Sequence, residues 1–167
     1  MAKQLKVTGY SWRPGTQHKV KPEVAAIEIN RLMEEHDQRV DAGVVVEAAA
    51  SPMNPLHPEF EWDDTAAARE HRLLQARNLM NAVQVTFETA KNGTITTSFT
   101  CTLEKPGTGG RKRDYSPMTW AMAQPDTRAE VLRQALRELA AFKHKYMNLS
   151  ELAQVIAVID KTLKKTG

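Results

Sequence analysis

The chain of 167 residues is poor in cysteine, glycine and aromatic side chains, with one Cys, eight Gly and 6% aromatic residues. The single Cys101 excludes an intramolecular disulfide and fits a reducing cytoplasm or a virion interior. We expect this thiol at an inward position of a strand, as a small buried hydrophobe. No apolar run approaches the roughly 18 residues that a membrane span requires, and the N-terminus lacks an apolar signal core. We therefore expect a soluble protein with no membrane partner.

The sequence also lacks the motifs of common catalytic and metal sites. Its five histidines show no H-x-x-x-H spacing, and no cysteine cluster accompanies them. There is no G-x-S-x-G motif and no nucleotide-binding fingerprint. We therefore predict a protein that is not an enzyme, has no catalytic residues and uses neither a cofactor nor a metal.

Charged residues of both signs are present but unevenly distributed. The formal net charge is +3 and the pI about 9.0, values that permit nucleic-acid binding without demonstrating it. Residues 1–21 are predicted to form a basic arm that also carries Tyr10 and Trp12. Cations and aromatic rings can bind phosphates and stack on bases, but the arm can equally pack its rings on the domain and leave its lysines solvated. The candidate nucleic-acid-binding residues of the arm are Lys3, Lys6, Arg13, Lys19 and Lys21.

A second basic segment, residues 105–113, combines cations with glycines. Its spacing is not that of a P-loop, and a flexible, solvated loop is the simpler interpretation. Three consecutive cations beside mobile glycines nevertheless favour contact with phosphates. The candidate nucleic-acid-binding residues of this segment are Lys105, Arg111, Lys112 and Arg113.

Three helices are predicted in the first half of the chain. Pro22 suits the first position of a helix that ends near His36. Asp41 can cap a short second helix, although the β-branched run that follows it leaves a strand as the alternative. The third helix ends near Met80. This order imitates a winged helix, but the loop of about twelve residues before the third helix is longer than the turn of a helix-turn-helix.

Two alternating segments, residues 83–89 and 95–103, predict a β-hairpin. A three-residue loop that ends at Gly93, with this glycine in the left-handed position of a bulge, pairs the apolar faces of the two strands. In this register Val85 lies opposite Phe99. The threonines of the second strand are expected to face solvent.

The segment from Ser51 to Met80 joins a proline-rich loop to the third helix. Its prolines predict a stiff extended path across the surface. Phe60 and Trp62 are expected to fill part of the core, with His57 at its rim. Asp63 or Asp64 is expected to cap the helix. Projection of the helix places Arg69 in the middle of its buried side and Arg77 at the edge of that side, and upstream carboxylates are expected to pair with them. This structural signature comprises His57, Phe60, Trp62, Asp63, Asp64, Arg69 and Arg77.

The run from Ser51 to Asp64 resembles a family of uncharacterised phage and prophage proteins with an S-P-L-H-x-x-F-E-W-D-D signature. The similarity extends from Trp12 through the C-terminal helices, and an inserted Met53-Asn54-Pro55 departs from the pattern. The resemblance implies a phage context, in the host cytoplasm or the virion. It brings no catalytic residues.

The predicted fold class is α+β, with three N-terminal helices, a β-hairpin that a third strand at residues 114–118 can extend to a three-stranded sheet, and a C-terminal helical hairpin. The predicted divisions are the arm at 1–21, the α+β core at 22–120 and the helical hairpin at 121–167, packed on the core. A capping box at Thr127–Glu130 opens that hairpin, which carries a long apolar stripe.

Two functional hypotheses follow from these features. In the first, the protein is a non-enzymatic phage or prophage protein that binds nucleic-acid phosphates with little sequence specificity. In the second, it is a phage structural or assembly protein whose partner is another copy of itself or another virion component.

Overall fold

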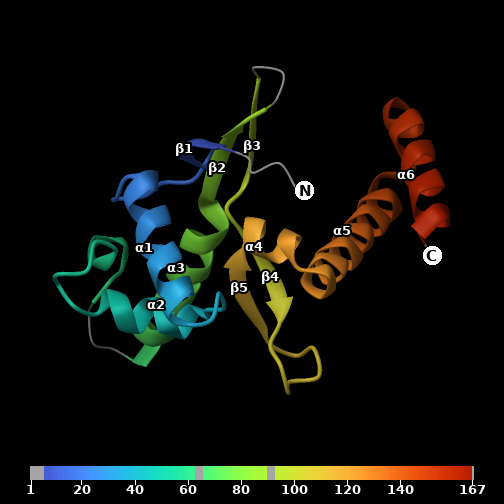
Figure 1. The fold of residues 1–167 in the computed structure, drawn as a ribbon. Coiled ribbons are helices and arrows are strands. Elements are labelled where there is room, and N and C mark those ends of the chain that lie inside the picture. The colour runs from blue at the N-terminus through green and yellow to red at the C-terminus, as the bar shows by residue number, and fades with distance from the viewer. Residues whose placement is uncertain (1–5, 63–65, 90–92, 167) are drawn as a thin grey trace. The chain divides into compact units, whose positions relative to one another are not determined.

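The computed structural model describes residues 6–62, 66–89 and 93–166 (Figure 1). The chain divides into two compact units, Met1–Ala121 and Met122–Gly167, each of which is described by itself. The first unit contains helices and strands and the second contains helices. The predicted mixture of helix and strand is therefore confirmed.

The first two helices form as the sequence predicts. Helix α1 is Pro22–Glu35, with its proline in the first turn, and α2 is Ala42–Ala49. Asp41 caps α2 by accepting a hydrogen bond from Val44 N at 3.2 Å, so this segment is a helix and not a strand. Helix α3, Ala66–Ala82, packs against α2. The predicted capping role of Asp63 and Asp64 lies outside the described residues.

The proline-rich segment between α2 and α3 is not the extended path that the prolines suggested. It makes consecutive turns and then the short 3-10 helix η1, His57–Glu59. The Asn54 side chain stabilises these turns: its Oδ1 accepts from Leu56 N at 2.9 Å, and its Nδ2 donates to Glu28 Oε1 of α1 at 2.7 Å. A side chain that bonds its own backbone favours a turn over an extended chain.

The N-terminal segment supplies a strand that the sequence did not predict. Strand β1, Lys6–Trp12, pairs antiparallel with β2, Val83–Glu88, and β2 pairs with β3, Thr94–Ser98, which gives a sheet of order β1-β2-β3. A bulge between Val7 and Gly9 interrupts the alternation of β1. Because the bulge adds a residue, Val7 and Tyr10 lie opposite Phe87 and Val85, a spacing of three that hides the strand from a period-two search.

The hairpin forms, but its predicted register is wrong by two residues. Val85 lies opposite Thr97 and not Phe99. Thr89 N donates to Gly93 O at 2.8 Å, and Gly93 N donates to Thr89 Oγ1 at 3.1 Å, so the hairpin closes between these residues. The predicted left-handed conformation of Gly93 is also wrong. A shift by two preserves which face each side chain occupies, so apolar patterning cannot distinguish the two registers.

The chain leaves the first sheet at Phe99. The buried Phe99 ring packs edge-on against Tyr10, with ring centroids 5.9 Å apart. Strand β4, Thr100–Glu104, then pairs with β5, Arg113–Pro117, in a separate two-stranded sheet. The third strand expected near 114–118 is therefore present but does not join the hairpin. Thr100, expected to face solvent, is buried and donates to Met80 O at 2.9 Å.

The core of the first unit lies between helices α1, α2 and α3 and the first sheet. Ile29, Met33, Leu79, Met80 and Val83 are among its fully buried side chains. Cys101 is half-buried, with its Sγ 3.7 Å from Ser116 O.

The second unit is a helical hairpin. Helix α4, Met118–Ala123, spans the boundary between the units. In the second unit α5 is Pro125–Tyr146, and η2, Ser150–Leu152, leads into α6, Ala153–Thr166. The predicted capping box is wrong: α5 begins at Pro125, so Thr127 lies inside its first turn and donates to Gln124 O at 3.3 Å.

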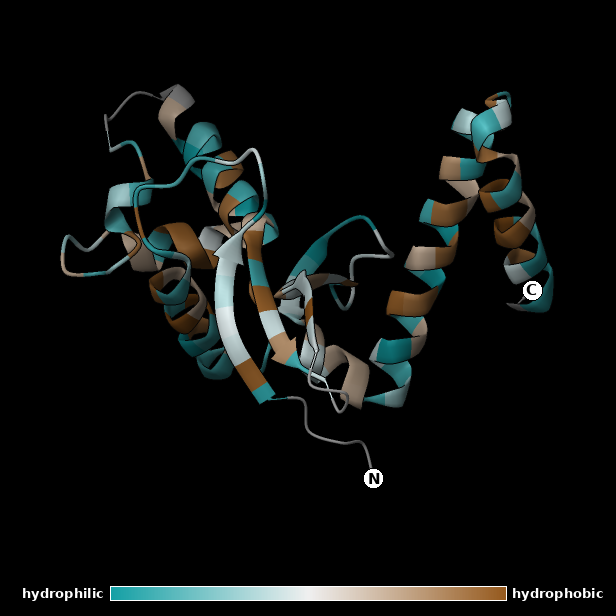
Figure 2. Cartoon of the chain, turned by 90° about the horizontal axis from the view of Figure 1, so that it is seen from above, coloured by the Kyte–Doolittle hydropathy of each residue, from teal (hydrophilic) through white to brown (hydrophobic). Residues whose placement is uncertain are grey.

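Helices α5 and α6 contact each other, and Lys143 pairs with Asp160 between them. Figure 2 shows apolar residues on both helices of the C-terminal hairpin, mixed with hydrophilic ones. Ile159 is buried at 6% exposure, whereas Leu132 is 52% and Val158 65% exposed.

Candidate nucleic-acid interface

A hollow of about 600 Å³ collects cationic side chains on the first unit. We call it the basic hollow. Its walls come from the start of α2, the exposed side of α3, and strands β4 and β5 with the loop between them. Its lining residues are Asp41, Ala42, Gly43, Arg69, Leu73, Arg77, Thr102, Lys105, Arg111, Lys112, Arg113 and Tyr115. Six of these are cationic and one is a carboxylate.

The β4–β5 loop is held by hydrogen bonds among its own residues. Lys105 N donates to Lys112 O at 2.9 Å, and Thr108 Oγ1 donates to Lys105 O at 2.7 Å. Gly107 and Gly110 have φ of 77° and 76°, left-handed values that a side chain rarely adopts. The glycines that were predicted to make the loop flexible allow its backbone to turn tightly. The side chains of Arg111 and Lys112 in this loop are exposed to solvent.

Three of the four predicted cations in this loop have partners inside the protein, and one of them is Arg111, whose Nε donates to Thr108 O at 3.2 Å. Lys105 Nζ lies 2.9 Å from Asp41 Oδ2 and 3.6 Å from the buried Asp114. The hydrogen bond to Asp41 raises the pKa of Lys105. Burial of Asp41 opposes its ionisation, but hydrogen bonds from Lys105 and Val44 N lower the pKa of Asp41 overall. Arg113 donates from Nη2 to Thr102 O at 2.9 Å, which orients its guanidinium along β4.

Arg69 and Arg77 also line the basic hollow, and here the sequence prediction was wrong. Both were expected on the buried side of α3 within an internal network of ion pairs, but both are exposed. The buried side of the helix is centred nearer Ala68, Ala76 and Leu79. Long arginine side chains can run along a helix surface and keep their charge in water, so their projected angle alone does not bury them. Within the described residues, no carboxylate forms a salt bridge with either arginine.

The upstream carboxylates that were expected to pair with these arginines have other partners. Glu59 accepts from Lys19 N at 2.6 Å and Val20 N at 2.7 Å, and its other oxygen lies 3.1 Å from His18 Nδ1. Glu61 interacts with α3 through its backbone, since Glu61 O accepts from Arg72 Nη1 at 3.3 Å.

The aromatic signature forms one stacked structural cluster. Phe60 is buried, and Trp62 stacks on His57 with ring centroids 4.8 Å apart. Trp62 Nε1 donates to His57 O at 3.0 Å, and the Arg72 guanidinium lies over the indole, 5.3 Å from its centroid. His57 Nδ1 lies 2.8 Å from Ala49 O, so this cluster ties the loop to the end of α2.

The predicted cations of the N-terminal arm do not line the basic hollow. Lys6 pairs with Glu88 at 3.9 Å across the sheet. Lys19 and Lys21 are exposed, Arg13 lines a different hollow, and Lys3 lies outside the described residues. The arm and the loop, which the sequence suggested as two parts of one interface, therefore do not form a single cationic surface through these residues.

The chemistry of the basic hollow is that of anion binding. Guanidinium and ammonium groups supply hydrogen-bond donors for phosphate oxygens, and arginine can do so with two parallel bonds. Sequence reasoning missed the contribution of α3, although Arg69, Leu73 and Arg77 recur every four residues and therefore share one side of a helix.

The structure also bears on metal binding and on membrane-spanning helices. In the described part of the chain, no group of three or more His, Cys, Asp or Glu side chains could hold a metal ion. Among the described helices, none combines the length and the apolar character that crossing a membrane demands.

Models of known families, curated proteins and solved structures were compared with the chain, and none gives a significant match.

Proposed function

We propose that the protein is a non-enzymatic phage or prophage protein that associates with nucleic acid through the basic hollow. The observation that carries this proposal is the convergence of six cationic side chains, from α3 and from the β4–β5 segment, on one concave surface with a single carboxylate. The phage context comes from the resemblance of the Ser51–Asp64 signature.

The proposed contacts are to the phosphate backbone and carry little sequence specificity. Arginine and lysine contacts to phosphate position a protein on nucleic acid without reading its bases. Asp41 neutralises part of the charge of Lys105, and Arg113 is half-buried and donates to Thr102. The four exposed cations of the basic hollow are Arg69, Arg77, Arg111 and Lys112, and of these Arg111 donates from Nε to Thr108 O at 3.2 Å.

The number of available cations predicts the salt dependence of binding. Neutralising four phosphates gives a slope of log K against log salt of about −3.6 for duplex DNA and about −2.8 for a single strand. A fluorescence-anisotropy titration across salt concentrations measures both slopes. Micromolar protein that binds neither form at low salt contradicts the proposal.

Paired substitutions locate the contacts. Arg69→Gln with Arg77→Gln, and separately Arg111→Gln with Lys112→Gln, should each reduce the magnitude of the duplex slope by about 1.8. The matched control is Arg133→Gln with Arg137→Gln, which removes two exposed arginines from α5 of the other unit. If the control flattens the slope as much as the test pairs, binding does not occur at the basic hollow.

A second candidate function is self-association through the C-terminal helices, as expected of a phage structural or assembly protein. The observation that favours it is the exposed apolar surface of this unit. Its large exposed apolar side chains are Met122, Leu132, Phe142, Met147, Leu149, Val155 and Val158. Among the described residues of the unit, only Ile159 is buried. Exposed apolar surface is a common feature of association sites and supports this second candidate.

Light scattering on the purified protein tests this second candidate. If the chain forms an oligomer, Val158→Glu should dissociate it without unfolding the protomer, because Val158 is 65% exposed. Lys164→Glu, at an exposed polar position on another side of the same helix, is the control and should leave the oligomer intact. A strict monomer at high concentration removes self-association as an explanation.

A further inference from the structure

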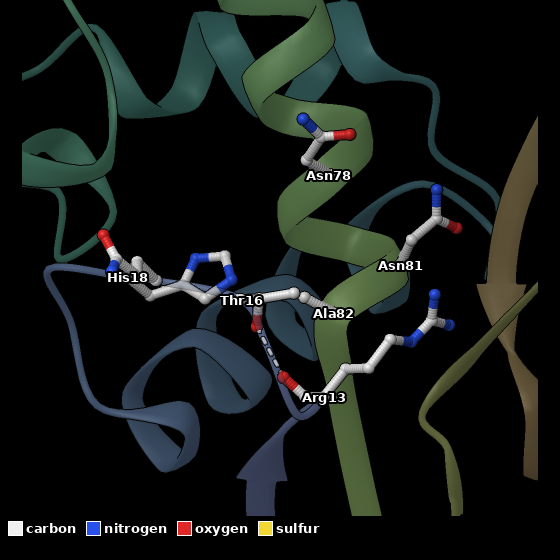
Figure 3. Close-up of a pocket in the computed structure, with 7 residues that line it drawn as sticks. Arg13, Thr16, His18, Asn78, Asn81 and Ala82 are labelled. Atoms are coloured by element: carbon white, nitrogen blue, oxygen red, sulfur yellow. Dashed lines mark hydrogen bonds between the residues drawn. The ribbon is translucent and has the colours of Figure 1, made fainter.

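The two edges of the first sheet differ in how they are protected against a further strand. An edge strand leaves backbone N–H and C=O groups unpaired, and proteins usually block it with a charge, a proline or a bulge. The β1 edge has two of these features, since Lys6 begins the strand and a bulge interrupts it. The strand runs into a turn beside the hollow drawn in Figure 3, where Arg13 N donates to Ala82 O at 2.9 Å and Thr16 Oγ1 donates to Arg13 O at 2.8 Å. The β1 edge is therefore a poor template for another strand.

Strand β3, at the other edge of the sheet, has none of these features. Its five residues, Thr-Ile-Thr-Thr-Ser, include no charge and no proline, and its pairing with β2 is regular. The first three of these residues are exposed. Within the described residues, no strand pairs with β3 on the side away from β2. β-Branched residues of this kind favour pairing in a sheet, so β3 is an unprotected edge.

The hydrogen bonds at the two ends of the β2–β3 ladder determine which backbone groups of β3 are already used. Thr89 N donates to Gly93 O at 2.8 Å, and Phe99 N donates to Val83 O at 3.0 Å. Hydrogen-bonded pairs alternate with non-bonded pairs along an antiparallel ladder. The odd-numbered residues of β3 therefore bond to β2.

The even-numbered residues of β3 direct their backbone groups away from β2. These residues are Thr94, Thr96 and Ser98, and each lies opposite a residue of β2 in a non-bonded pair. Each supplies one N–H donor and one C=O acceptor to the open side of the strand. The three residues are spaced as the bonded positions of a second antiparallel ladder.

We propose that β3 pairs antiparallel with β3 of a second copy of the chain, with Thr96 on the twofold axis. In this register Thr96 pairs with Thr96 of the second copy, and Thr94 pairs with Ser98. All outward backbone groups of β3 then have partners, and the sheets of the two copies become continuous. An interface of this kind is isologous, because both copies contribute the same surface.

The charges near β3 favour a second copy as the occupant of this edge. Glu88 lies opposite Thr94 at one end of the strand, and the neutral Gln84 lies opposite Ser98 at the other. The twofold axis brings the end with Glu88 of one copy to the end with Gln84 of the other. Like charges therefore do not face each other across the interface, and β3 itself carries none.

The side chains of β3 are also complementary to themselves in this register. Ile95 is 52% exposed and lies opposite Thr97 of the second copy, in a non-bonded pair where side chains approach most closely. Pairs of β-branched residues across strands are stabilising. Because of the twofold axis, this contact forms twice.

Sedimentation equilibrium of the full chain between about 10 μM and about 1 mM tests the proposal. Two five-residue edges bury less surface than a standard interface, so we expect a dimer with a Kd of about 0.1 mM. Amide hydrogen exchange followed by NMR should show protection of Thr96 N–H that increases with protein concentration. A chain that remains monomeric at about 1 mM, with Thr96 N–H unprotected, overturns the proposal and leaves the edge to a strand of another protein.

Charges placed at the twofold axis test the register. Thr96→Lys and Thr96→Glu each put like charges opposite each other, so each should weaken the dimer at least about tenfold. An equimolar mixture of the two variants should recover the dimer, because opposite charges then face each other. Thr96 is exposed, and tryptophan fluorescence checks that both variants are folded. A mixture of folded variants that stays monomeric overturns pairing centred on Thr96. The exchange measurement on the unmodified chain needs no variant and decides the question if either variant fails to fold.

Thr8→Lys, on the β1 edge, is the matched control. Thr8 and Thr96 are both exposed and flank Thr86: Thr8 Oγ1 donates to Thr86 O at 3.3 Å, and Thr96 Oγ1 lies 2.9 Å from Thr86 Oγ1. Thr8→Lys should change the dimer Kd less than about twofold.

The proposal does not rest on nucleic-acid binding by the basic hollow or on self-association through the C-terminal helices. Val158→Glu, which addresses those helices, should leave the β3 dimer intact. Conversely, an oligomer that Val158→Glu dissociates and Thr96→Lys does not is formed by the C-terminal helices, and this result overturns pairing through β3.

Discussion

Glu28 is the buried carboxylate that joins α1 to the proline-rich turns, and its removal should destabilise the first unit. Glu28 accepts from Arg31 Nη2 at 2.6 Å and Nε at 3.0 Å, and from Asn54 Nδ2 at 2.7 Å. The Glu28 side chain is 8% exposed, whereas that of Arg31 is 46% exposed. The perturbation is Glu28→Gln, which preserves the shape of the side chain and removes its charge.

The size of the effect follows from these contacts. Hydrogen bonds to a charged group contribute about 1.5–3 kcal/mol each, but solvent screens an arginine that is nearly half exposed. We therefore expect Glu28→Gln to lower the free energy of unfolding by about 1.5 kcal/mol. Glu35→Gln is the matched control, since Glu35 also pairs with Arg31 but at the surface. It should cost less than about 1 kcal/mol.

Urea denaturation followed by tryptophan fluorescence measures this loss for the first unit alone. Trp12, Trp62 and Trp120 are the three tryptophans of the chain, and all lie within Met1–Ala121. The second unit therefore contributes no tryptophan signal. Circular dichroism at 222 nm gives the unfolding of both units for comparison.

The pH dependence provides a separate check on the sign of the effect. The hydrogen bond from Arg31, the largest influence, holds the pKa of Glu28 below its ordinary value of 4.5. The contribution of Glu28 is therefore fully present above the unfolded pKa and is lost as pH falls through the lower folded value. The stability difference between the unmodified protein and Glu28→Gln should be constant above about pH 5.5 and shrink below about pH 4.5. Equal losses for Glu28→Gln and Glu35→Gln, or a difference that grows on acidification, refute the reasoning.

Three further predictions address other parts of the molecule. Asp41→Asn keeps an N-cap acceptor for α2 but frees Lys105, so it should tighten DNA binding about twofold to fivefold at low salt, and anisotropy should show no such gain at high salt. Leu79→Ala, at a fully buried position, should lower the stability of the first unit by about 2–5 kcal/mol in the fluorescence-detected urea curve, and a loss below about 1 kcal/mol contradicts its place in the core. Ile159→Ala should shift the circular-dichroism transition of the second unit and leave the tryptophan transition unchanged, whereas a change in both shows that the units unfold together.

Local patterns in the sequence were sufficient for the elements whose structure depends on neighbours along the chain. The proline in the first turn of α1 and the capping aspartate of α2 act within one turn of a helix, so both helices could be located from residue type and spacing. The strand at 113–117 and the helical character of the C-terminal third were likewise readable. The presence of strands and helices in one chain followed from the two periodicities.

Partnerships between distant segments were decided by the tertiary structure. The bulge in β1 interrupts the alternation of apolar and polar residues. The hairpin register differs from the predicted one by two residues, a shift that keeps each side chain on the same face. Phe99 lies beyond the end of β3 and packs on Tyr10. Apolar patterning specifies which face a side chain occupies but not which strand lies opposite, and this choice depends on contacts between residues far apart in sequence.

The same distinction applies to the basic hollow. The cations at 105–113 were evident as a cluster because they adjoin one another in the sequence. Arg69 and Arg77 line the same hollow because α3 packs on α2. Glu59, which was expected to pair with these arginines, instead binds the backbone of Lys19 and the His18 ring. Charge type can be read from a sequence, but the distance between charges on separate elements is set by the fold, and that distance determines whether they can bind one anion together.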